Sequence, residues 1–468
     1  MEVAKRARLR FFGAVGEVTG SCHLLQYEQG EVLLDCGLFQ GGNDADQRNA
    51  ANFPFDPEKI DALILSHAHI DHCGRLPLLV KRGFNAPIYT HPATARLLRV
   101  MLEDSARLAL ADAKHANRRR AREGRAPIEP LYGLEDVEAV HGLVVAIPYA
   151  ERQAILPGLE LCFADAGHIL GAAIVQLWVD SAGETRHLVF SGDIGSRDAP
   201  FMVDPERISS ADLVLMESTY GDRLHRARSD TVAELGGILE SAWNKGGNVL
   251  IPAFAVGRSQ ELLYWLAKHH RDWGLDRWRI YLDSPMAVKV TSVYKQHHEL
   301  FDEEMQADWH GPRNPFKMKN LKLVSSVEES RALNQLTKGA IIIAGSGMCT
   351  GGRIRHHLKH NLWRPQCHVL FSGYQANGTL GRKLVDGAKH VSLMGERIRV
   401  AANLHTIGGL SAHADQNGLA EWYGGFANRP PVCLLHGEDR SRSALAVRLR
   451  DQFGAEVSLA ELPVEVEI

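Results

Sequence analysis

Four potential metal ligands are crowded into an H-x-H-x-D-H motif formed by His67, His69, Asp71 and His72. The motif directly follows the apolar run Ala62–Ser66, which has the composition of a buried strand. Imidazole and carboxylate groups together suit zinc, with iron or manganese as alternatives. One segment of this kind can serve two neighbouring ions, His67 and His69 facing one and Asp71 and His72 the other. Solvated loops rarely carry ligands at this density, so the motif predicts a metal site.

Two further ligand candidates also stand at the ends of apolar runs. His168 follows the run Leu161–Ala164, and Asp193 follows the run His187–Ser191. Taken alone, a histidine among apolar residues is usually a hydrogen-bonded core residue, and a Ser-Gly-Asp triplet is usually a turn. In this order behind the first motif, the two residues extend the predicted metal site.

Short apolar runs separated by glycine turns predict a β-rich region from residue 8 to about residue 220. A helix is expected within it over Thr94–Asp112. From about residue 230 apolar strands alternate with helices, which indicates parallel βαβ units, and Asp230 is the expected N-cap of the first helix there. The strands expected in the first region are 9–14, 22–27, 32–35, 62–66, 161–164, 173–179, 187–191 and 212–216. Those expected later are strands 249–254, 280–283, 321–324, 340–344, 368–372, 398–400, 432–435 and 456–459, with helices 260–268 and 288–300.

This rhythm predicts an α/β fold in which a β-rich domain is interrupted by a second, Rossmann-like domain. The first part of the interrupted domain is expected over residues 1–221, the inserted domain over 222–395, and the C-terminal part over 396–468. A length of 468 residues is compatible with about three such units.

Composition excludes several classes of protein. The 53 Lys and Arg against 56 Asp and Glu give a net charge of −3, so only a local basic surface could attract a polyanion. The seven cysteines are scattered without a C-x-x-C pair, which favours reduced thiols in the cytoplasm over disulfides or a cysteine-based zinc site. No apolar run is long enough for a signal peptide or a membrane span, so we expect no membrane partner.

The ligand motif, His168, Asp193 and the upstream Asp35 together resemble the metallo-β-lactamase superfamily, whose fold is an αβ/βα sandwich. The resemblance implies that His67, His69 and His168 hold a first metal ion. It assigns Asp71 and His72 to a second ion, makes Asp193 the bridge between the two, and gives Asp35 the task of orienting a ligand.

Three later segments narrow the resemblance to the β-CASP branch of that superfamily, which cleaves nucleic acids. They are Met216–Gly221, Ser411–Asp415 and Leu435–Glu438, and they carry Glu217, His413 and His436. The resemblance assigns His436 to the second metal ion. It also implies that Asp71, Glu217 and His413 are catalytic, with His413 donating a proton and Glu217 holding its ring.

Segments of the inserted domain resemble the RNA-metabolising subgroup, which includes short bacterial ribonucleases and the nuclease subunit of the pre-mRNA 3′-end cleavage complex. These segments are Ile251–Arg258, Gly345–Met348 and Phe371–Ala376. The implied function is hydrolysis of single-stranded RNA by a hydroxide bound to two Zn²⁺ ions per chain, leaving 5′-phosphate and 3′-hydroxyl ends. The resemblance leaves open whether other divalent metals replace zinc, whether DNA is also a substrate and whether the protein forms a homo-oligomer. It also does not decide between endonuclease and 5′-exonuclease action.

Two other functions compete with the ribonuclease. A small-molecule metallo-hydrolase acting on thioesters or lactones needs the metal ligands alone and gives Glu217, His413 and the inserted domain no role. A non-catalytic RNA-binding scaffold would be expected to have lost metal ligands, whereas this chain keeps all seven.

Glycine-rich turns at the starts of helices are expected to contact RNA phosphates through free backbone N–H groups. Phe254 and Tyr374 are candidates for base stacking, although core packing is the ordinary fate of such residues. The basic segment Arg107–Leu131 reads either as a solvated helix face or as an RNA-binding arm. The candidate RNA contacts are Arg258, Ser346, Arg353, Ser372, Arg382 and Ser411.

Overall fold

The computed structural model describes residues 6–41, 44–373, 375–376, 378–462 and 464–468. The chain divides into two compact units. The first combines Met1–Asp198, Val203–Leu224 and His413–Ile468, and the second combines Ala199–Met202 and His225–Ala412. No helix within the described ranges is both long enough and apolar enough to cross a membrane.

The first unit contains two seven-stranded sheets among its described residues. One has the order β22-β1-β2-β3-β4-β5-β6, and the other has the order β21-β20-β11-β10-β9-β8-β7. The strands of the first sheet are β22 (Glu465–Glu467), β1 (Arg8–Phe11), β2 (His23–Tyr27), β3 (Gly30–Leu34), β4 (Ala62–Ile64), β5 (Ile88–Thr90) and β6 (Val144–Ala146). The strands of the second are β21 (Val457–Leu459), β20 (Val432–Leu435), β11 (Leu213–Glu217), β10 (Glu184–Phe190), β9 (Ala173–Ser181), β8 (Leu159–Asp165) and β7 (Gln153–Leu156).

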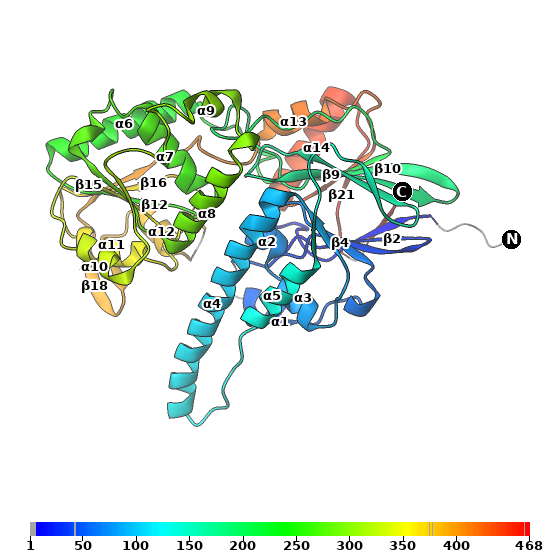
Figure 1. Ribbon diagram of the computed structural model, residues 1–468, viewed down its shortest axis with the longest axis horizontal. Helices are drawn as coiled ribbons and strands as arrows, with labels where there is room; N and C mark the ends of the chain where they lie inside the picture. Colours follow the sequence, from blue (N-terminus) through cyan, green and yellow to red (C-terminus); the bar gives the residue numbers. More distant parts are fainter. Residues whose placement is uncertain (1–5, 42–43, 374, 377, 463) are drawn as a thin grey trace. The chain divides into compact units, whose positions relative to one another are not determined.

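The core of the first unit lies between these two sheets, where alternate residues of their strands pack together, for example Leu25 and Ile64 against Val175 and Leu215. A second cluster joins the other face of the first sheet to α3, α4 and α5. On the second sheet, α14 packs against β20 and β21. The helices of this unit are α1 (Ala45–Ala50), α2 (Ile70–Cys73), α3 (Leu76–Lys81), α4 (Pro92–Arg122), α5 (Leu134–Leu143), α13 (Gln416–Tyr423) and α14 (Asp439–Phe453). The predicted αβ/βα sandwich is thus confirmed (Figure 1).

The second unit is built on a parallel sheet with the order β14-β13-β15-β12-β16-β19, and β17 and β18 form a separate antiparallel pair. Its central strands, such as Val249–Pro252 and Ala340–Ala344, are continuous apolar runs, as expected where a sheet is covered by helices on both faces. The strands are β14 (Leu321–Leu323), β13 (Arg279–Leu282), β15 (Ala340–Ala344), β12 (Val249–Pro252), β16 (His368–Phe371), β19 (Asn403–Thr406), β17 (His390–Leu393) and β18 (Glu396–Arg399). The helices are α6 (Arg228–Asn244), α7 (Arg258–Lys268), α8 (Pro285–Gln296), α9 (Glu303–Asp308), α10 (Val327–Leu333), α11 (Ile354–Asn361) and α12 (Leu380–Val385).

Some boundaries differ from those expected. Residues 396–412 belong to the second unit, because β19 pairs with β16, whereas a return to the first domain was expected at residue 396. The expectation that Asp230 caps a helix is wrong: α6 begins at Arg228, so Asp230 lies in its first turn. The helix expected over Thr94–Asp112 extends to Arg122, well beyond its last apolar contact with the core.

Candidate metal centre

The C-terminal ends of three parallel neighbours in the second sheet meet at one edge. Because β10, β11 and β20 run in the same direction, Asp193, Glu217 and His436 come from adjacent strand ends. His168 lies in the loop between β8 and β9, and its own neighbour Gly167 has a φ of +64°. Gly192 adopts a φ of +53° and has no room for a side chain, since a Cβ there would lie 2.9 Å from Ser66 Cβ. This close approach brings Asp193 against the segment that follows β4.

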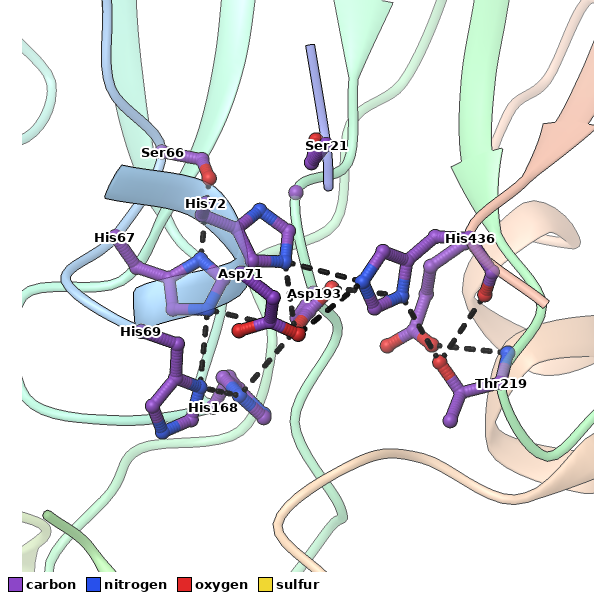
Figure 2. Close-up of polar contacts among 12 residues, drawn as sticks. Ser21, Ser66, His67, His69, Asp71, His72, His168, Asp193, Thr219 and His436 are labelled. Atoms are coloured by element: carbon purple, nitrogen blue, oxygen red, sulfur yellow. Dashed lines mark hydrogen bonds and ion pairs between the residues drawn. The ribbon is translucent and has the colours of Figure 1, made fainter. Parts of the chain in front are cut away.

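The H-x-H-x-D-H motif changes conformation in its middle. His67 and His69 lie in extended chain after β4, and His69 is the N-cap of α2. Asp71 and His72 then lie in the first turn of that helix. The bend places the two halves of the motif in different groups of potential ligands (Figure 2).

The first ligand group consists of His67, His69, His168 and Asp193. His69 Nδ1 lies 3.1 Å from His67 Nε2 and 3.1 Å from His168 Nε2. Asp193 Oδ2 lies 3.4 Å from His67 Nε2 and 3.5 Å from His168 Nε2. Four ligand atoms placed tetrahedrally at zinc distances lie about 3.3–3.4 Å from one another. The spacing of these four atoms therefore fits a zinc-sized ion.

The second ligand group consists of Asp71, His72 and His436, and Asp193 of the first group lies next to it. His72 Nε2 lies 3.1 Å from His436 Nε2 and 3.4 Å from Asp193 Oδ2. His436 Nε2 lies 3.7 Å from Asp71 Oδ2. Asp193 Oδ2 thus faces imidazoles of both groups, and Asp193 Oδ1 is buried without a hydrogen-bond partner in the described part of the chain. A bridging carboxylate would have this arrangement.

The protonation of the site favours metal binding. Burial lowers the pKa of His67 and His168, and it lowers the pKa of His69 to about 3, so these imidazoles are neutral near pH 7. Burial alone would raise the pKa of Asp193, but the surrounding imidazoles, His436 and His72 first, hold it well below its usual value. Burial alone would lower the pKa of His72, but Asp193 and Asp35 raise it well above its ordinary value. A positive charge is therefore stabilised at this point, be it a proton or a metal ion.

Asp35 lies behind the ligands, in the position expected of a residue that orients one of them. Its Oδ2 atom is 2.7 Å from His72 Nδ1, which leaves Nε2 of that ring directed at the site. Asp35 is fully buried and accepts hydrogen bonds from the hydroxyls of Ser21 and Ser66 and from the Ser66 backbone. Burial would raise the pKa of this carboxyl, but the contact with His72 keeps it below its usual value.

Glu217 and His413 form a pair next to the ligands. Glu217 is fully buried, and its carboxylate accepts the backbone N–H groups of Ile194 and Thr219 at 2.7 and 3.2 Å. His413 Nδ1 lies 3.2 Å from Glu217 Oε1 and 3.9 Å from Asp193 Oδ2. Burial would lower the pKa of His413, but the charges of Glu217 and Asp193 outweigh it and raise the pKa to about 9.

Three polar residues of the site were missed by the sequence analysis. Ser21 and Ser66 hold Asp35, and the hydroxyl of Thr219 lies 3.2 Å from His436 Nδ1. Ser66 and Thr219 each stand within two residues of a predicted site residue, and that adjacency was the available signal. Ser21 lies on a preceding segment and had no such signal.

Several of the candidate RNA contacts are already bonded to other groups of the chain. Arg258 is bound to the backbone oxygens of Ser372 and Leu410 and to Glu261, and Arg353 lies 2.6 Å from the buried Asp283. Arg382 is paired with Asp386, the C-cap of α12, at 2.9 Å. The Ser346 hydroxyl accepts the Gly351 N–H at 3.1 Å, Ser372 is buried, and Ser411 is partly buried.

The aromatic candidates have different outcomes. The prediction that Phe254 packs in the core is wrong, because 48% of this residue is exposed. Its ring lies against Gly347 and leaves no room for a Cβ there. The strand expected to reach Phe254 ends at Pro252, which places the ring in a loop. Tyr374 lies outside the described residues.

Three family models match separate parts of the chain. The model of the metallo-beta-lactamase superfamily matches residues 15–152, that of the Beta-Casp domain residues 259–384, and that of the Zn-dependent metallo-hydrolase RNA specificity domain residues 397–460. The chain is 45% identical to Ribonuclease TTHA0252 of Thermus thermophilus over 450 residues, which cover 96% of this chain and 97% of that protein. It is 31% identical to Transcription termination factor FttA of Methanocaldococcus jannaschii over 95% of this chain and 69% of that protein.

A solved structure of a protein of unknown function from Enterococcus faecalis shares the fold. It covers 99% of this chain with a TM-score of 0.57 and 11% sequence identity, and all of that chain is matched. The chain belongs to the metallo-β-lactamase superfamily, in the RNA-metabolising subgroup of its β-CASP branch.

Proposed function

We propose that the chain is a ribonuclease that hydrolyses phosphodiester bonds of single-stranded RNA with two zinc ions, leaving 5′-phosphate and 3′-hydroxyl ends. The observation that carries this proposal is the combination of two ligand groups sharing Asp193 with the adjacent pair of His413 and Glu217. A relative named as a ribonuclease and the match to an RNA specificity domain support RNA as the substrate.

The ligands divide between the two ions as follows. His67, His69 and His168 would hold one ion, Asp71, His72 and His436 the other, and Asp193 both. When bound, such a pair of ions activates a water molecule and offsets the charge that develops on the phosphate. Asp35 fixes the ring of His72 for this task.

His413 supplies the proton that the leaving oxygen requires. A pKa of about 9 keeps its ring protonated at neutral pH, and 21% of its side chain is exposed, so it can reach a substrate. Glu217 cannot turn away, because two backbone N–H groups bind its carboxylate. It therefore orients the His413 ring and stabilises its charged form.

The alternative functions explain less of the site. A thioester or lactone hydrolase gives no role to a buried carboxylate held beside a protonated histidine. A scaffold without activity gives no reason for two complete ligand groups. All seven cysteines are unpaired and buried, which supports the cytoplasm as the compartment.

The test is the chemistry of the cleaved ends. The zinc-loaded protein is incubated with a labelled single-stranded 30-nucleotide RNA and, in parallel, with the same RNA carrying one 2′-deoxynucleotide at the cleavage site. We expect 5′-phosphate and 3′-hydroxyl fragments from both by mass spectrometry, because the ribose hydroxyl takes no part in bond breaking. A 2′,3′-cyclic phosphate, or a deoxy substrate that binds but is never cut, would contradict the mechanism. A thioester substrate serves as the control for the competing activity.

A further inference from the structure

The helix α4 extends far beyond the core of its unit. It spans 31 residues, which corresponds to about 46 Å. It begins beside the metal centre, where the Thr94 hydroxyl donates to the backbone oxygen of Gly171, in the loop that carries His168. After Ala106 the one buried residue of the helix is Ala113.

The far half of α4 is nevertheless an ordered structure. The chain returns along it, and Asn117 both donates to the backbone oxygen of Ile128 at 2.8 Å and accepts its N–H at 2.7 Å. Arg120 donates to the backbone oxygen of Ala126 at 2.6 Å. We call residues 107–131, helix end and returning segment together, the basic arm.

The basic arm carries charge opposite to that of the whole chain. Seven Lys and Arg against three Asp and Glu give it a net charge of +4, while the chain has −3. Lys114, Arg118 and Arg122 stand four residues apart and share one face of the helix. All three are exposed, and none has an ion-pair partner among the residues that the structure describes. By contrast, Arg119 and Arg125 are both paired with Glu123.

A solvated helix face explains exposed charges but not this arrangement. Like charges four residues apart repel and weaken a helix, and the far half of α4 has almost no core contact to offset the repulsion. An anionic ligand along the stripe would remove that repulsion. A row of cations on a preformed surface matches a phosphate backbone, which needs charge and no particular base.

We propose that Lys114, Arg118 and Arg122 bind the backbone of the substrate RNA, several nucleotides away from the bond that is cut. The inference rests on the proposed ribonuclease function. Lys114 stands 22 residues along α4 from Pro92, which corresponds to about 33 Å. A stacked strand advances about 3.4 Å per nucleotide, so roughly ten nucleotides separate the metal centre from the stripe. A tetranucleotide at the metal centre cannot reach it.

The test compares two triple variants that each remove three positive charges from exposed arginines or lysines of the same unit. One is Lys114→Gln with Arg118→Gln and Arg122→Gln. The matched control is Arg8→Gln with Arg152→Gln and Arg186→Gln, whose side chains are 54, 48 and 42% exposed. Binding of a single-stranded 30-nucleotide RNA is measured with the metal chelated, between 0.1 and 1 M salt. Cleavage of that RNA and of a tetranucleotide is measured with zinc.

Each phosphate contact on a single strand contributes about −0.7 to the log–log salt slope. We therefore expect the arm variant to bind the 30-nucleotide RNA about 10–100-fold more weakly at 0.1 M salt, with a slope shallower by about 2 and with little difference at 1 M. Its cleavage of the tetranucleotide should equal that of the unaltered protein and the control.

Unchanged affinity and slope would overturn the proposal and would point to a protein partner for the arm. Equal losses on the long RNA and the tetranucleotide would also overturn it, because they would show damage to the fold or the centre. If the unaltered protein binds RNA in the expected way but cuts neither substrate, the proposed ribonuclease function is refuted, whereas the proposal that the basic arm binds RNA stands.

Discussion

His413 Nδ1 lies 3.2 Å from Glu217 Oε1, and the same oxygen accepts the Ile194 backbone N–H at 2.7 Å. The backbone thus fixes the carboxylate, and the carboxylate fixes the histidine. The charge on Glu217 also contributes to a pKa of about 9 for His413. Glu217 therefore both orients the His413 ring and favours its protonated form.

Replacement of His413 by alanine should separate chemistry from binding. We expect His413→Ala to keep its metal and its RNA affinity and to lose about 10²–10⁴ in cleavage rate, the usual contribution of a general acid. Single-turnover kinetics with elemental analysis of the same samples measures both. A variant that has lost a metal ion would show that the roles of His413 and His436 were exchanged.

The pH profile should report the same pair. In the proposed mechanism protonated His413 is the active form. Because its pKa is raised to about 9, activity that depends on this proton should persist to about pH 9 and then fall. Glu217→Gln removes the neighbouring negative charge, so the fall should move to lower pH. If the fall in activity at high pH occurs at the same pH in Glu217→Gln, the group that titrates there is not His413.

Metal content should depend on the shared carboxylate more than on a single histidine. We expect about two zinc ions per chain in the unaltered protein, because two ligand groups are present. His69→Ala should weaken the first group alone, whereas Asp193→Ala should lower occupancy of both, because Asp193 Oδ2 faces imidazoles of each. Full cleavage by a thoroughly chelated sample would refute the requirement for metal.

Gly192 offers a test of positioning without touching a ligand. A Cβ at this residue would lie 2.9 Å from Ser66 Cβ and 3.0 Å from the backbone oxygen of Ala173, so Gly192→Ala must push Asp193 and His67 apart. We expect metal affinity to fall about 10–100-fold, as for other changes behind metal ligands. Gly183→Ala is the control, since Gly183 also has positive φ (+86°) but open space around it. Equal affinities in the two variants would contradict the steric argument.

Asp165 should make stability depend on pH. Burial, with a smaller effect of Glu206, raises the pKa of Asp165 to about 7, whereas an unfolded aspartate has about 3.9. Its stabilising contribution is therefore complete below about pH 4 and is lost as the pH rises through 7. With EDTA present, Asp165→Asn should be more stable than the unaltered protein by about 4 kcal/mol at pH 8, and by less at pH 5. Calorimetry at both pH values measures this difference in stability. Glu456→Gln, which removes a negative charge from the surface, is the control.

The candidate ligands could be predicted because they share a local signal, a polar residue shortly after the end of an apolar strand. His67, His168 and Asp193 each have it, and the structure brings them together because the strands they follow end at one place. The fold class followed from the same strands, whose alternation with helices is visible without tertiary information.

The arginines could not be predicted because their partners are distant in sequence. Arg353 is held by Asp283, 70 residues earlier, and Arg258 by the backbone at Ser372 and Leu410. No local pattern distinguishes such residues from arginines that face solvent. The start of α6 at Arg228, two residues before the expected N-cap Asp230, was not predicted either.

The order of β20 in the second sheet has a consequence for synthesis of the chain. Its neighbour β11 is complete about 200 residues before β20 is made, and His436 follows β20 directly. At about 5–20 residues per second, a ribosome needs roughly 10–40 s to cover that interval. During this time the sheet lacks β20 and the second ligand group lacks His436. A nascent or prematurely terminated chain therefore lacks the complete candidate metal centre while it is still close to its own messenger RNA.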